Sequence, residues 1–404
     1  MNLRKISLFS FIAFFTFIQF DGLGQDKPYV LLVSFDGFRH DYVEKYNLPN
    51  FKKFIQQGSA AKSLVPSFPS KTFPNHYTLV TGLYPGNHGL IANTFFAPER
   101  KTTYGTRDRS SVEDPYYYGG TPLWQLTREN GLKSASYFWV GSEAPIKGHF
   151  PDFYYIYDGR VPNNSRIDQV KTWLELPSEE RPHFISLYFS LVDTQGHRTG
   201  PNSKELQNTV IEADSILGYL METLDQIDLP VNTILVSDHG MINVNTLDAI
   251  DAKAIAKEIP GSATMIKDKI ISFVYLPQNE VESTYQRIKA LEDNFRVFKK
   301  GELPKKWHYN ENDRIGDLVL LANPGYAFRP EKVKEEITGE HGYDPYTTTE
   351  MHGIFYANGP NIKKGKELKS IENVHVFPLV TKILGFENPP IDGKFSKVKK
   401  IYKK

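Results

Sequence analysis

The chain has 404 residues, of which 40% are hydrophobic and 24% charged, and its formal net charge is +1. This is the composition of an ordinary globular protein with a large core. The nearly balanced charge argues against a nucleic-acid scaffold, since such proteins carry basic patches. The sequence contains no cysteine. Disulfides, lipid-modified cysteines and thiolate metal sites are therefore excluded, and any zinc must be held by nitrogen and oxygen atoms.

Residues 1–24 have the pattern of a secretory signal peptide. Arg4 and Lys5 precede an apolar run over residues 6–20, and small residues lead to Gln25. The pattern predicts an exported protein, periplasmic or secreted, with a mature chain from residue 25. A signal anchor is the rival interpretation, but the apolar run is short for a membrane span and the polar Asp21 follows it. We therefore expect no stable membrane anchor.

Strand-like and helix-like segments then alternate along the chain. Apolar, strand-like runs occupy residues 29–35, 134–139, 184–192 and 231–237. Helix-like segments occupy residues 49–57, 122–130 and 204–227. This alternation predicts an α/β fold with a mostly parallel central sheet and helices on both faces. The runs that begin at residues 29, 184 and 231 are apolar on both faces, as expected for central, buried strands.

Two further segments bear on domain organisation. Residues 94–114 are polar and rich in Tyr and Arg, and we expect a long loop over the site there. A second alternation over residues 249–330, with strands at 270–276 and 318–322 and a helix at 280–291, suggests an inserted lobe. No internal repeat or low-complexity linker is present. We therefore expect residues 25–404 to form a single domain with insertions.

Aspartate and histidine residues gather at the ends of the strand-like runs. Parallel strands end at the same edge of a sheet, so these side chains are expected to meet there. Three carboxylates with three imidazoles are enough ligands for two divalent ions. Taken alone, each of these residues would be interpreted as a helix cap or an ordinary polar group. The set consists of Asp36, Asp193, His197, Asp238, His239 and His341.

Thr72 follows an extended stretch and precedes a helical one, with Pro74 in the first turn. One interpretation is that Thr72 only caps the helix. The other is that its hydroxyl, next to a divalent cation and a helix N-terminus, is a nucleophile toward phosphorus. The residues alone leave both open.

Five strings of the sequence bear on its function. They are Phe35-Asp-Gly-Phe, Lys71-Thr-Phe-Pro-Asn-His-Tyr-Thr-Leu-Val-Thr-Gly-Leu-Tyr-Pro, Asp193-Thr-Gln-Gly-His197, Ser237-Asp-His-Gly-Met and Glu340-His-Gly-Tyr-Asp. These strings resemble the nucleotide pyrophosphatase/phosphodiesterase family of the alkaline phosphatase superfamily. They occur in the family's order, and the resemblance covers roughly residues 28–390. It implies an alkaline phosphatase-like fold and a phosphoric diester hydrolase.

The resemblance also implies a mechanism. Two zinc ions would be bound, one by Asp193, His197 and His341, the other by Asp36, Asp238, His239 and the Thr72 hydroxyl. Thr72 would attack phosphorus in line and form a phosphothreonine intermediate, which water then hydrolyses. The Asn93 amide and the Thr72 backbone amide would stabilise the charged phosphoryl oxygens.

Departures from the family pattern are small. The chain has Asp344-Pro345 where the family often has an Asp-Asn pair. His352 competes with His341 for the last ligand position, but the family string favours His341. His76 and His88 are expected to be structural.

Aromatic residues near these motifs bear on the substrate. An aromatic residue on or after a strand is usually part of the core. In nucleotide-cleaving members of the family, however, similar positions form a slot in which a base stacks. We therefore expect a nucleotide or dinucleotide substrate, bound by Asn93 and by Phe73, Trp139, Glu143, Tyr157 and Tyr188.

The expected activity is hydrolysis of nucleotide phosphodiester and pyrophosphate bonds, for example a nucleoside triphosphate to the monophosphate and pyrophosphate. A lysophospholipid or phosphocholine-type phosphodiesterase on the same two-zinc site is the alternative enzyme. A non-catalytic zinc- or nucleotide-binding protein is the alternative outside enzymes. A sulfatase is excluded, because Thr72-Phe-Pro-Asn75 lacks the oxidisable residue and the arginine of that motif. No segment resembles an oligomerisation element, so the oligomeric state is left open.

Overall fold

The computed structural model describes residues 27–245, 247, 249–329 and 337–404. The expected signal peptide, residues 1–24, lies outside the described residues.

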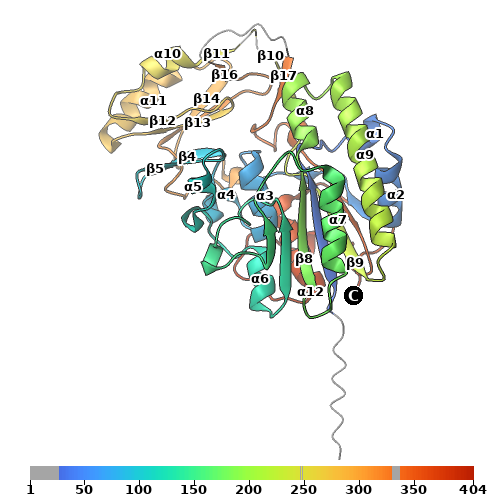
Figure 1. The fold of residues 1–404 in the computed structure, drawn as a ribbon. Helices are drawn as coiled ribbons and strands as arrows, with labels where there is room; N and C mark the ends of the chain where they lie inside the picture. Colours follow the sequence, from blue (N-terminus) through green and yellow to red (C-terminus); the bar gives the residue numbers. More distant parts are fainter. Residues whose placement is uncertain (1–26, 246, 248, 330–336) are drawn as a thin grey trace, which may run out of the picture.

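An eight-stranded sheet forms the centre of the molecule, in the order β19-β2-β18-β9-β1-β8-β6-β7 (Figure 1). Neighbours among the last five strands pair in parallel. β18 runs antiparallel to both of its neighbours. The predicted mostly parallel sheet is confirmed. The strands are β1 (Tyr29–Phe35), β2 (Ser59–Ala61), β6 (Lys133–Tyr137), β7 (Phe153–Tyr155), β8 (Pro182–Phe189), β9 (Val231–Val236), β18 (Phe355–Asn358) and β19 (Lys366–Leu368).

Helices cover both faces of this sheet, as predicted. All seven residues of β1 are buried, and alternate residues enter two different apolar cores. Leu31 and Val33 pack with α2 (Pro49–Gln57), α7 (Asn163–Leu174) and α9 (Lys204–Asp225). Val30 and Leu32 pack on the side of α3 (Thr72–Thr81), α6 (Leu123–Glu129) and α12 (Val376–Leu384). Burial on both faces explains why the strand is continuously apolar.

The strand predicted over residues 184–192 ends earlier in the structure. β8 stops at Phe189, and α8 (Leu191–Thr199) begins two residues later. Leu191 and Val192 are apolar because they start this helix, and an apolar run alone does not distinguish a strand from a buried helix start. Asp193 therefore lies in the first turn of α8.

The long loop predicted over residues 94–114 is wrong. β4 (Thr94–Ala97) and β5 (Thr102–Gly105) form an antiparallel hairpin, followed by the short helix α5 (Arg109–Val112). Phe95 and Tyr104 are opposite each other across the hairpin, with ring centroids 4.9 Å apart. Two strands of four residues are too short for their alternation to stand out in a polar sequence.

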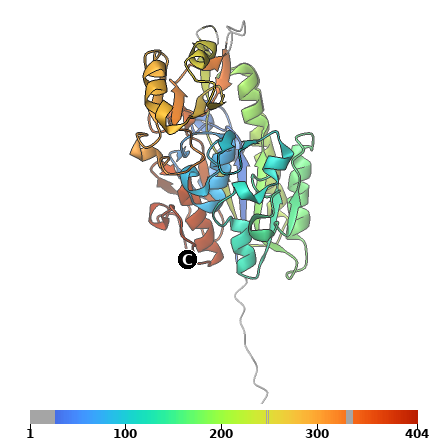
Figure 2. The same cartoon turned by 90° about the vertical axis from the view of Figure 1, so that its left-hand side faces the viewer.

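A second, four-stranded antiparallel sheet lies beyond one end of the central sheet, and the C-terminus lies at the other end (Figures 1 and 2). Its order is β12-β13-β15-β14, with α11 (Val281–Lys289) against it. We call residues 249–329 the lobe. That the lobe is an insertion in a single domain stays a prediction. The strands of the second sheet are β12 (Thr264–Ile266), β13 (Ile271–Tyr275), β14 (Phe295–Lys299) and β15 (Leu318–Ala322).

Within the described part of the chain, no helix combines the length and the apolar character that a membrane crossing needs.

Candidate functional site

The carboxylates that come after three parallel strands lie close together. Asp36 follows β1, Asp238 follows β9 and Asp193 opens the helix after β8. Because β1 lies between β8 and β9, the three carboxylates meet at the carboxyl edge of the sheet. The Asp193 amide donates to the Asp36 carbonyl at 3.0 Å. Gly37 turns the chain here with φ +68°, and a Cβ on it would lie 2.9 Å from the Asp193 Cα.

The three histidines of the predicted ligand set reach the same edge of the sheet from three segments. His239 directly follows Asp238. His341 follows β17 (Ile337–Glu340), which pairs antiparallel with β10 (Ile242–Asn245), the next strand after His239. His197 lies one turn after Asp193 on α8, with its Nε2 3.4 Å from Asp193 Oδ1. All six residues predicted as ligands are therefore together.

Two groups within this cluster have ligand atoms close enough to hold an ion. One is Asp193, His239 and His341, and the other is Asp36, Asp238 and His239. His239 is common to both, and its ring stacks on that of His341 with centroids 3.5 Å apart. The predicted division instead gave His197 to the first ion and His239 to the second only. His197 lies beside the first group, with its ring centroid 5.1 Å from that of His341.

The three cluster histidines are oriented by backbone carbonyls. In each ring Nδ1 lies at hydrogen-bond distance from a carbonyl oxygen, so Nδ1 carries the proton and donates. In the neutral imidazole Nε2 then has the lone pair, which is the arrangement of a metal-binding histidine. The Nδ1 atoms of His197, His239 and His341 lie 2.7, 2.9 and 2.8 Å from the oxygens of Gly339, Gly240 and Ser70.

Three carboxylate oxygens of the cluster are buried and have no hydrogen-bond partner. They are Asp36 Oδ1, Asp193 Oδ1 and Asp238 Oδ2, which histidine Nε2 atoms approach at 3.5, 3.4 and 3.0 Å without completing a hydrogen bond. A buried carboxylate oxygen without a partner is costly, and a bound cation removes that cost. The donors are nitrogen and oxygen only, which suits a divalent ion such as zinc. The cluster therefore fits divalent metal ions.

The protonation of the cluster reflects its burial. Burial and the nearby Asp238 carboxylate raise the pKa of Asp36 well above its usual value. Burial likewise raises the pKa of Asp193. Burial opposes ionisation of Asp238 too, but His239 and His76 hold the pKa of Asp238 well below its usual value. At any pH at which Asp36 or Asp193 is protonated, binding of a cation therefore displaces that proton.

Thr72 lies at the edge of the cluster. It is the first residue of α3, and its Oγ1 is 3.1 Å from His239 Nε2. Lys71, not Thr72, occupies the N-cap position. The prediction that Thr72 is the cap is therefore wrong by one residue, because the extended backbone continues to Lys71. The hydroxyl of Thr72 is left to face the ligand cluster.

The loop after β17 and the turn before Thr72 are bonded to each other. The Ser70 hydroxyl donates to the Tyr343 carbonyl at 2.8 Å and accepts from the Gly342 amide at 3.2 Å. Gly342 has φ +122°, and a Cβ on it would lie 2.6 Å from the Lys71 Cε. Only glycine leaves room for the Lys71 stem here. The candidate nucleophile and the candidate ligand His341 are therefore positioned by one network.

Asn93 lies next to Thr72, as predicted. Its Oδ1 accepts a hydrogen bond of 3.0 Å from the Phe73 amide. With the oxygen bound to the backbone, the Asn93 NH₂ group is directed elsewhere and remains a donor.

A cavity of about 210 Å³ lies beside Thr72. Phe73, Trp139, Glu143, Tyr157 and Tyr188 all line it, so the structure brings together every predicted aromatic residue of the slot. Tyr157 is 45% exposed, whereas Trp139 is 1% exposed and its indole Nε1 donates to the His76 carbonyl at 3.0 Å. Trp139 is a wall of the cavity, and Phe73 and Tyr157 offer the accessible rings. The Tyr188 hydroxyl donates to Asp36 Oδ2 at 2.6 Å.

Several contributors were not predicted. Arg109 lines the cavity and forms an ion pair with Glu143, whose Oε1 also accepts from the Tyr157 amide at 3.0 Å. Arg109 lies in the segment that was predicted to be a loop, so the sequence did not indicate that its side chain points to the cavity. His76, expected to be only structural, has its Nδ1 3.3 Å from Asp238 Oδ2. Its position four residues after Thr72, on the same helix face, was the available signal.

Comparisons with known proteins agree with this arrangement. Residues 30–344 match the type I phosphodiesterase / nucleotide pyrophosphatase family. Human ectonucleotide pyrophosphatase/phosphodiesterase family member 1 is 36% identical over 400 residues, which is 94% of this chain but 42% of the human protein. The bis(5'-adenosyl)-triphosphatase enpp4 of Xenopus laevis is 32% identical over 382 residues, 94% of this chain and 82% of that protein.

The same family appears among solved structures. An inactive variant of murine ectonucleotide pyrophosphatase / phosphodiesterase 5 in complex with AMP has a TM-score of 0.87 and 30% identity, over 93% of this chain and all of that one. The fold is thus alkaline phosphatase-like, as the sequence motifs implied. The chain belongs to the type I phosphodiesterase / nucleotide pyrophosphatase family.

Proposed function

We propose that this chain is an exported, zinc-dependent phosphodiesterase that hydrolyses phosphodiester and pyrophosphate bonds of nucleotides, with Thr72 as the nucleophile. The observation that carries the proposal is the position of Thr72. It borders the ligand cluster, with Oγ1 3.1 Å from His239 Nε2, and it also lines the aromatic cavity. A phosphoryl group at Thr72 would have its charge at the cluster and its organic substituent in the cavity.

Two divalent ions are proposed to occupy the cluster. Asp193, His197 and His341 would hold one, and Asp36, Asp238, His239 and the Thr72 hydroxyl the other. The orphaned carboxylate oxygens and the carbonyl-oriented imidazoles support this assignment. When bound, such ions supply positive charge and Lewis acidity to the phosphoryl oxygens.

The chain's own groups would perform the transfer in two steps. Thr72 Oγ1 passes its proton to solvent and forms a bond to phosphorus, while the bond from phosphorus to the leaving oxygen breaks and that oxygen departs with the electron pair. Water then cleaves the phosphothreonine, which restores Thr72 and releases the nucleoside monophosphate. The Asn93 NH₂ group and the Thr72 amide at the start of α3 would donate to the non-bridging oxygens, where charge builds up.

The cavity supports a nucleotide as the substrate. Flat aromatic faces hold any base by stacking, and Phe73 and Tyr157 provide them. One relative is a bis(5'-adenosyl)-triphosphatase, and the murine structure binds AMP. We infer that the base of the substrate lies between these two rings.

Three p-nitrophenyl esters test this proposal with the purified chain, namely those of thymidine monophosphate, phosphate and phosphocholine. The nucleotide ester should dominate, and a chelator should abolish its hydrolysis. Thr72→Ala should lower kcat by at least about a thousandfold, since it removes the nucleophile. Thr172→Ala, at an exposed threonine on α7, is the matched control.

Each other outcome has a distinct meaning. Preference for the phosphocholine ester would show that the cavity accepts a choline headgroup and not a nucleotide, and the mechanism would be unchanged. Full activity in Thr72→Ala would exclude the covalent intermediate.

The proposed export depends on residues 1–24. Fractionation of cells that express the chain with and without these residues tests it. We expect the full sequence outside the cytoplasm in a processed form, and retention of an unprocessed chain would contradict export.

A further inference from the structure

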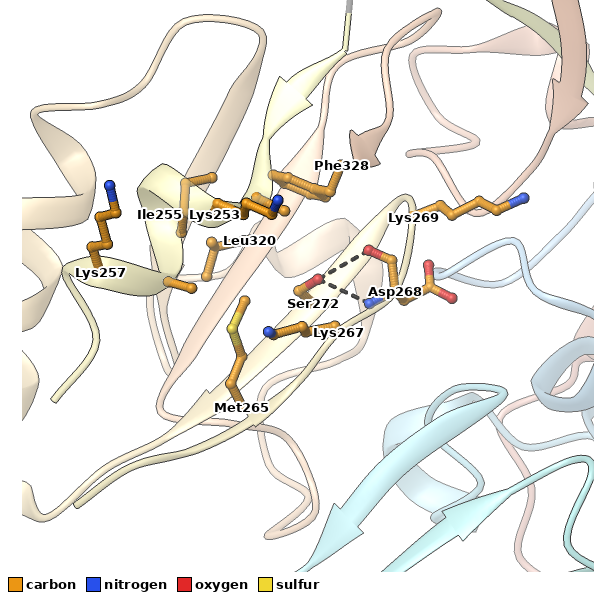
Figure 3. Close-up of a pocket in the computed structure, with 12 residues that line it drawn as sticks. Lys253, Ile255, Lys257, Met265, Lys267, Asp268, Lys269, Ser272, Leu320 and Phe328 are labelled. Atoms are coloured by element: carbon orange, nitrogen blue, oxygen red, sulfur yellow. Dashed lines mark hydrogen bonds between the residues drawn. The ribbon is translucent and has the colours of Figure 1, made fainter. Parts of the chain in front are cut away.

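A second cavity, of about 610 Å³, lies entirely within the lobe (Figure 3). Helix α10 (Ala252–Lys257) forms one side, and β12, β13, β15 and the strand β16 (Phe328–Arg329) contribute the others. It shares no lining residue with the cavity beside Thr72. Its volume is in the range of ~300–1,000 Å³ that small-molecule sites occupy.

The interior of the lobe cavity is apolar. Ile255, Met265, Leu320 and Phe328 converge on it from separate elements (Figure 3). Ala252 and Ala256 face it from α10 and are too small to fill it. An unfilled apolar space forfeits packing, and an apolar ligand restores those contacts.

The rim of the lobe cavity is basic. Four lysines line it, from α10 and from the turn between β12 and β13. Asp268, the one acidic residue of the lining, is paired with Lys71 outside the cavity at 2.9 Å. Lys257 and Lys267 are exposed, and neither has an ion-pair partner within the described ranges. The lysines are Lys253, Lys257, Lys267 and Lys269.

The one uncharged polar side chain of the lining, Ser272, does not suit a nucleobase. The Ser272 hydroxyl accepts from the Asp268 amide and donates to the Asp268 carbonyl, both at 3.1 Å. Its hydrogen-bonding capacity is used within the turn (Figure 3). A base edge buried in the apolar interior against Ser272 would lose hydrogen bonds to water that this hydroxyl does not replace, whereas an alkyl chain would lose nothing.

We propose that the lobe cavity is a binding site for an amphipathic anion, with an aliphatic chain against Leu320 and Phe328 and a carboxylate head at Lys267, within the basic rim. The apolar interior provides the affinity for the chain. Lys267 provides a charge-assisted hydrogen bond to the head, and the other rim lysines add positive charge around it. Binding at this site does not depend on the proposed hydrolytic activity.

Calorimetric titration of the mature chain with dodecanoate tests the proposal. Saturable one-to-one binding is expected. Dodecanol, which lacks the charge, and dodecyltrimethylammonium, which reverses it, should both bind at least about tenfold more weakly. Lack of saturable dodecanoate binding, or equal affinity for dodecanol, would overturn the proposal.

Two variants locate the site. Lys257→Glu combined with Lys267→Glu should weaken dodecanoate binding at least about tenfold, because the head meets repulsion. Lys363→Glu combined with Lys364→Glu makes the same charge change at exposed positions outside the lobe and should leave binding unchanged. Ala256→Phe fills the cavity from α10 and should abolish binding of the chain. Unaltered binding in both cavity variants would place the ligand elsewhere and refute the assignment.

Discussion

Lys71 Nζ lies 2.9 Å from Asp268 Oδ1, and this ion pair joins the residue before Thr72 to the lobe. The Lys71 side chain is only 7% exposed. Burial disfavours the ionised form of Asp268, yet Lys71 lowers its pKa below the usual value. The pair connects the cap residue of α3 to a distant part of the sequence, and removal of one partner would leave the other charge without compensation.

Asp268→Asn should lower the turnover number for a nucleotide ester about tenfold with a smaller change in KM. The substitution keeps the shape of the side chain but removes the charge that holds Lys71, so the turn that carries Thr72 loses a positioning contact. The free energy of unfolding should also fall by ~2 kcal/mol. Steady-state kinetics and urea unfolding measure the two effects.

Asp313→Asn is the matched control for this variant. Asp313 is also in the lobe and pairs with Lys300 at 3.4 Å, but its side chain is 83% exposed. It should change neither kinetics nor stability appreciably. Equal effects of the two substitutions would show that the Lys71 contact has no special role.

Glu143→Gln should raise KM for the p-nitrophenyl ester of thymidine monophosphate about tenfold. Glu143 is buried and joins Arg109 to the backbone of Tyr157. Loss of its charge removes the ion pair that holds the Arg109 side chain against the cavity. A small diester without a base, bis(p-nitrophenyl) phosphate, should be hydrolysed almost as before.

Arg109 has a second partner that serves as the control. Glu113 pairs with it at 2.6 Å, but both side chains are nearly half exposed there. Glu113→Gln should leave both substrates unaffected. If Glu143→Gln slowed both substrates equally, its role would lie in the phosphoryl site and not in the slot.

Binding of zinc to the metal-free chain should release protons. Burial raises the pKa of Asp36 and of Asp193, so the metal-free cluster retains protons that a cation displaces. Zinc affinity should consequently fall as the pH falls. Calorimetric titration in two buffers with different ionisation enthalpies detects the released protons. Identical heats in the two buffers would show that the cluster is already fully deprotonated.

His88 should make the protein sensitive to acid. The imidazole is fully buried, with Nε2 3.1 Å from the Thr78 hydroxyl, and burial lowers its pKa from 6.5 to about 3. Between these two values the unfolded chain binds a proton that the folded chain does not, so stability falls as the pH falls through this window. Above pH 6.5 this contribution is complete.

His88→Gln removes this titration. In the presence of a chelator, the free energy of unfolding of the variant should decrease less than that of the wild type between pH 7 and pH 5. Urea unfolding at the two pH values measures the difference. Parallel decreases in both proteins would show that His88 does not contribute.

Much of the central architecture could be predicted from local sequence. The apolar runs that end in Asp36 and Asp238 are buried strands, and a parallel sheet brings their ends together whatever the rest of the chain does. Asp193 and His197 meet because they are one helical turn apart. The place of His341 followed from its motif, because the pairing of β10 with β17 depends on residues far apart in the sequence.

Contacts between distant side chains were harder to predict. Nothing near Asp268 in the sequence indicates that Lys71 is its partner. Trp139 was expected in the slot, and the sequence does not show that its indole bonds to the His76 carbonyl. The hairpin at β4 and β5 was missed because its pattern covers only eight residues in two short strands. In each case the deciding interaction is tertiary, and local propensity is a weak guide to it.

The close approach of Lys71 to Gly342 also restricts how this site can evolve. A side chain at position 342 would be strained at φ +122° and would also collide with the Lys71 stem, so a shorter residue at position 71 would remove only the collision. Such a shorter residue would no longer reach Asp268. Gly342 and the Lys71–Asp268 pair should therefore be retained together in descendants of this sequence, although they lie in three separate segments of the chain.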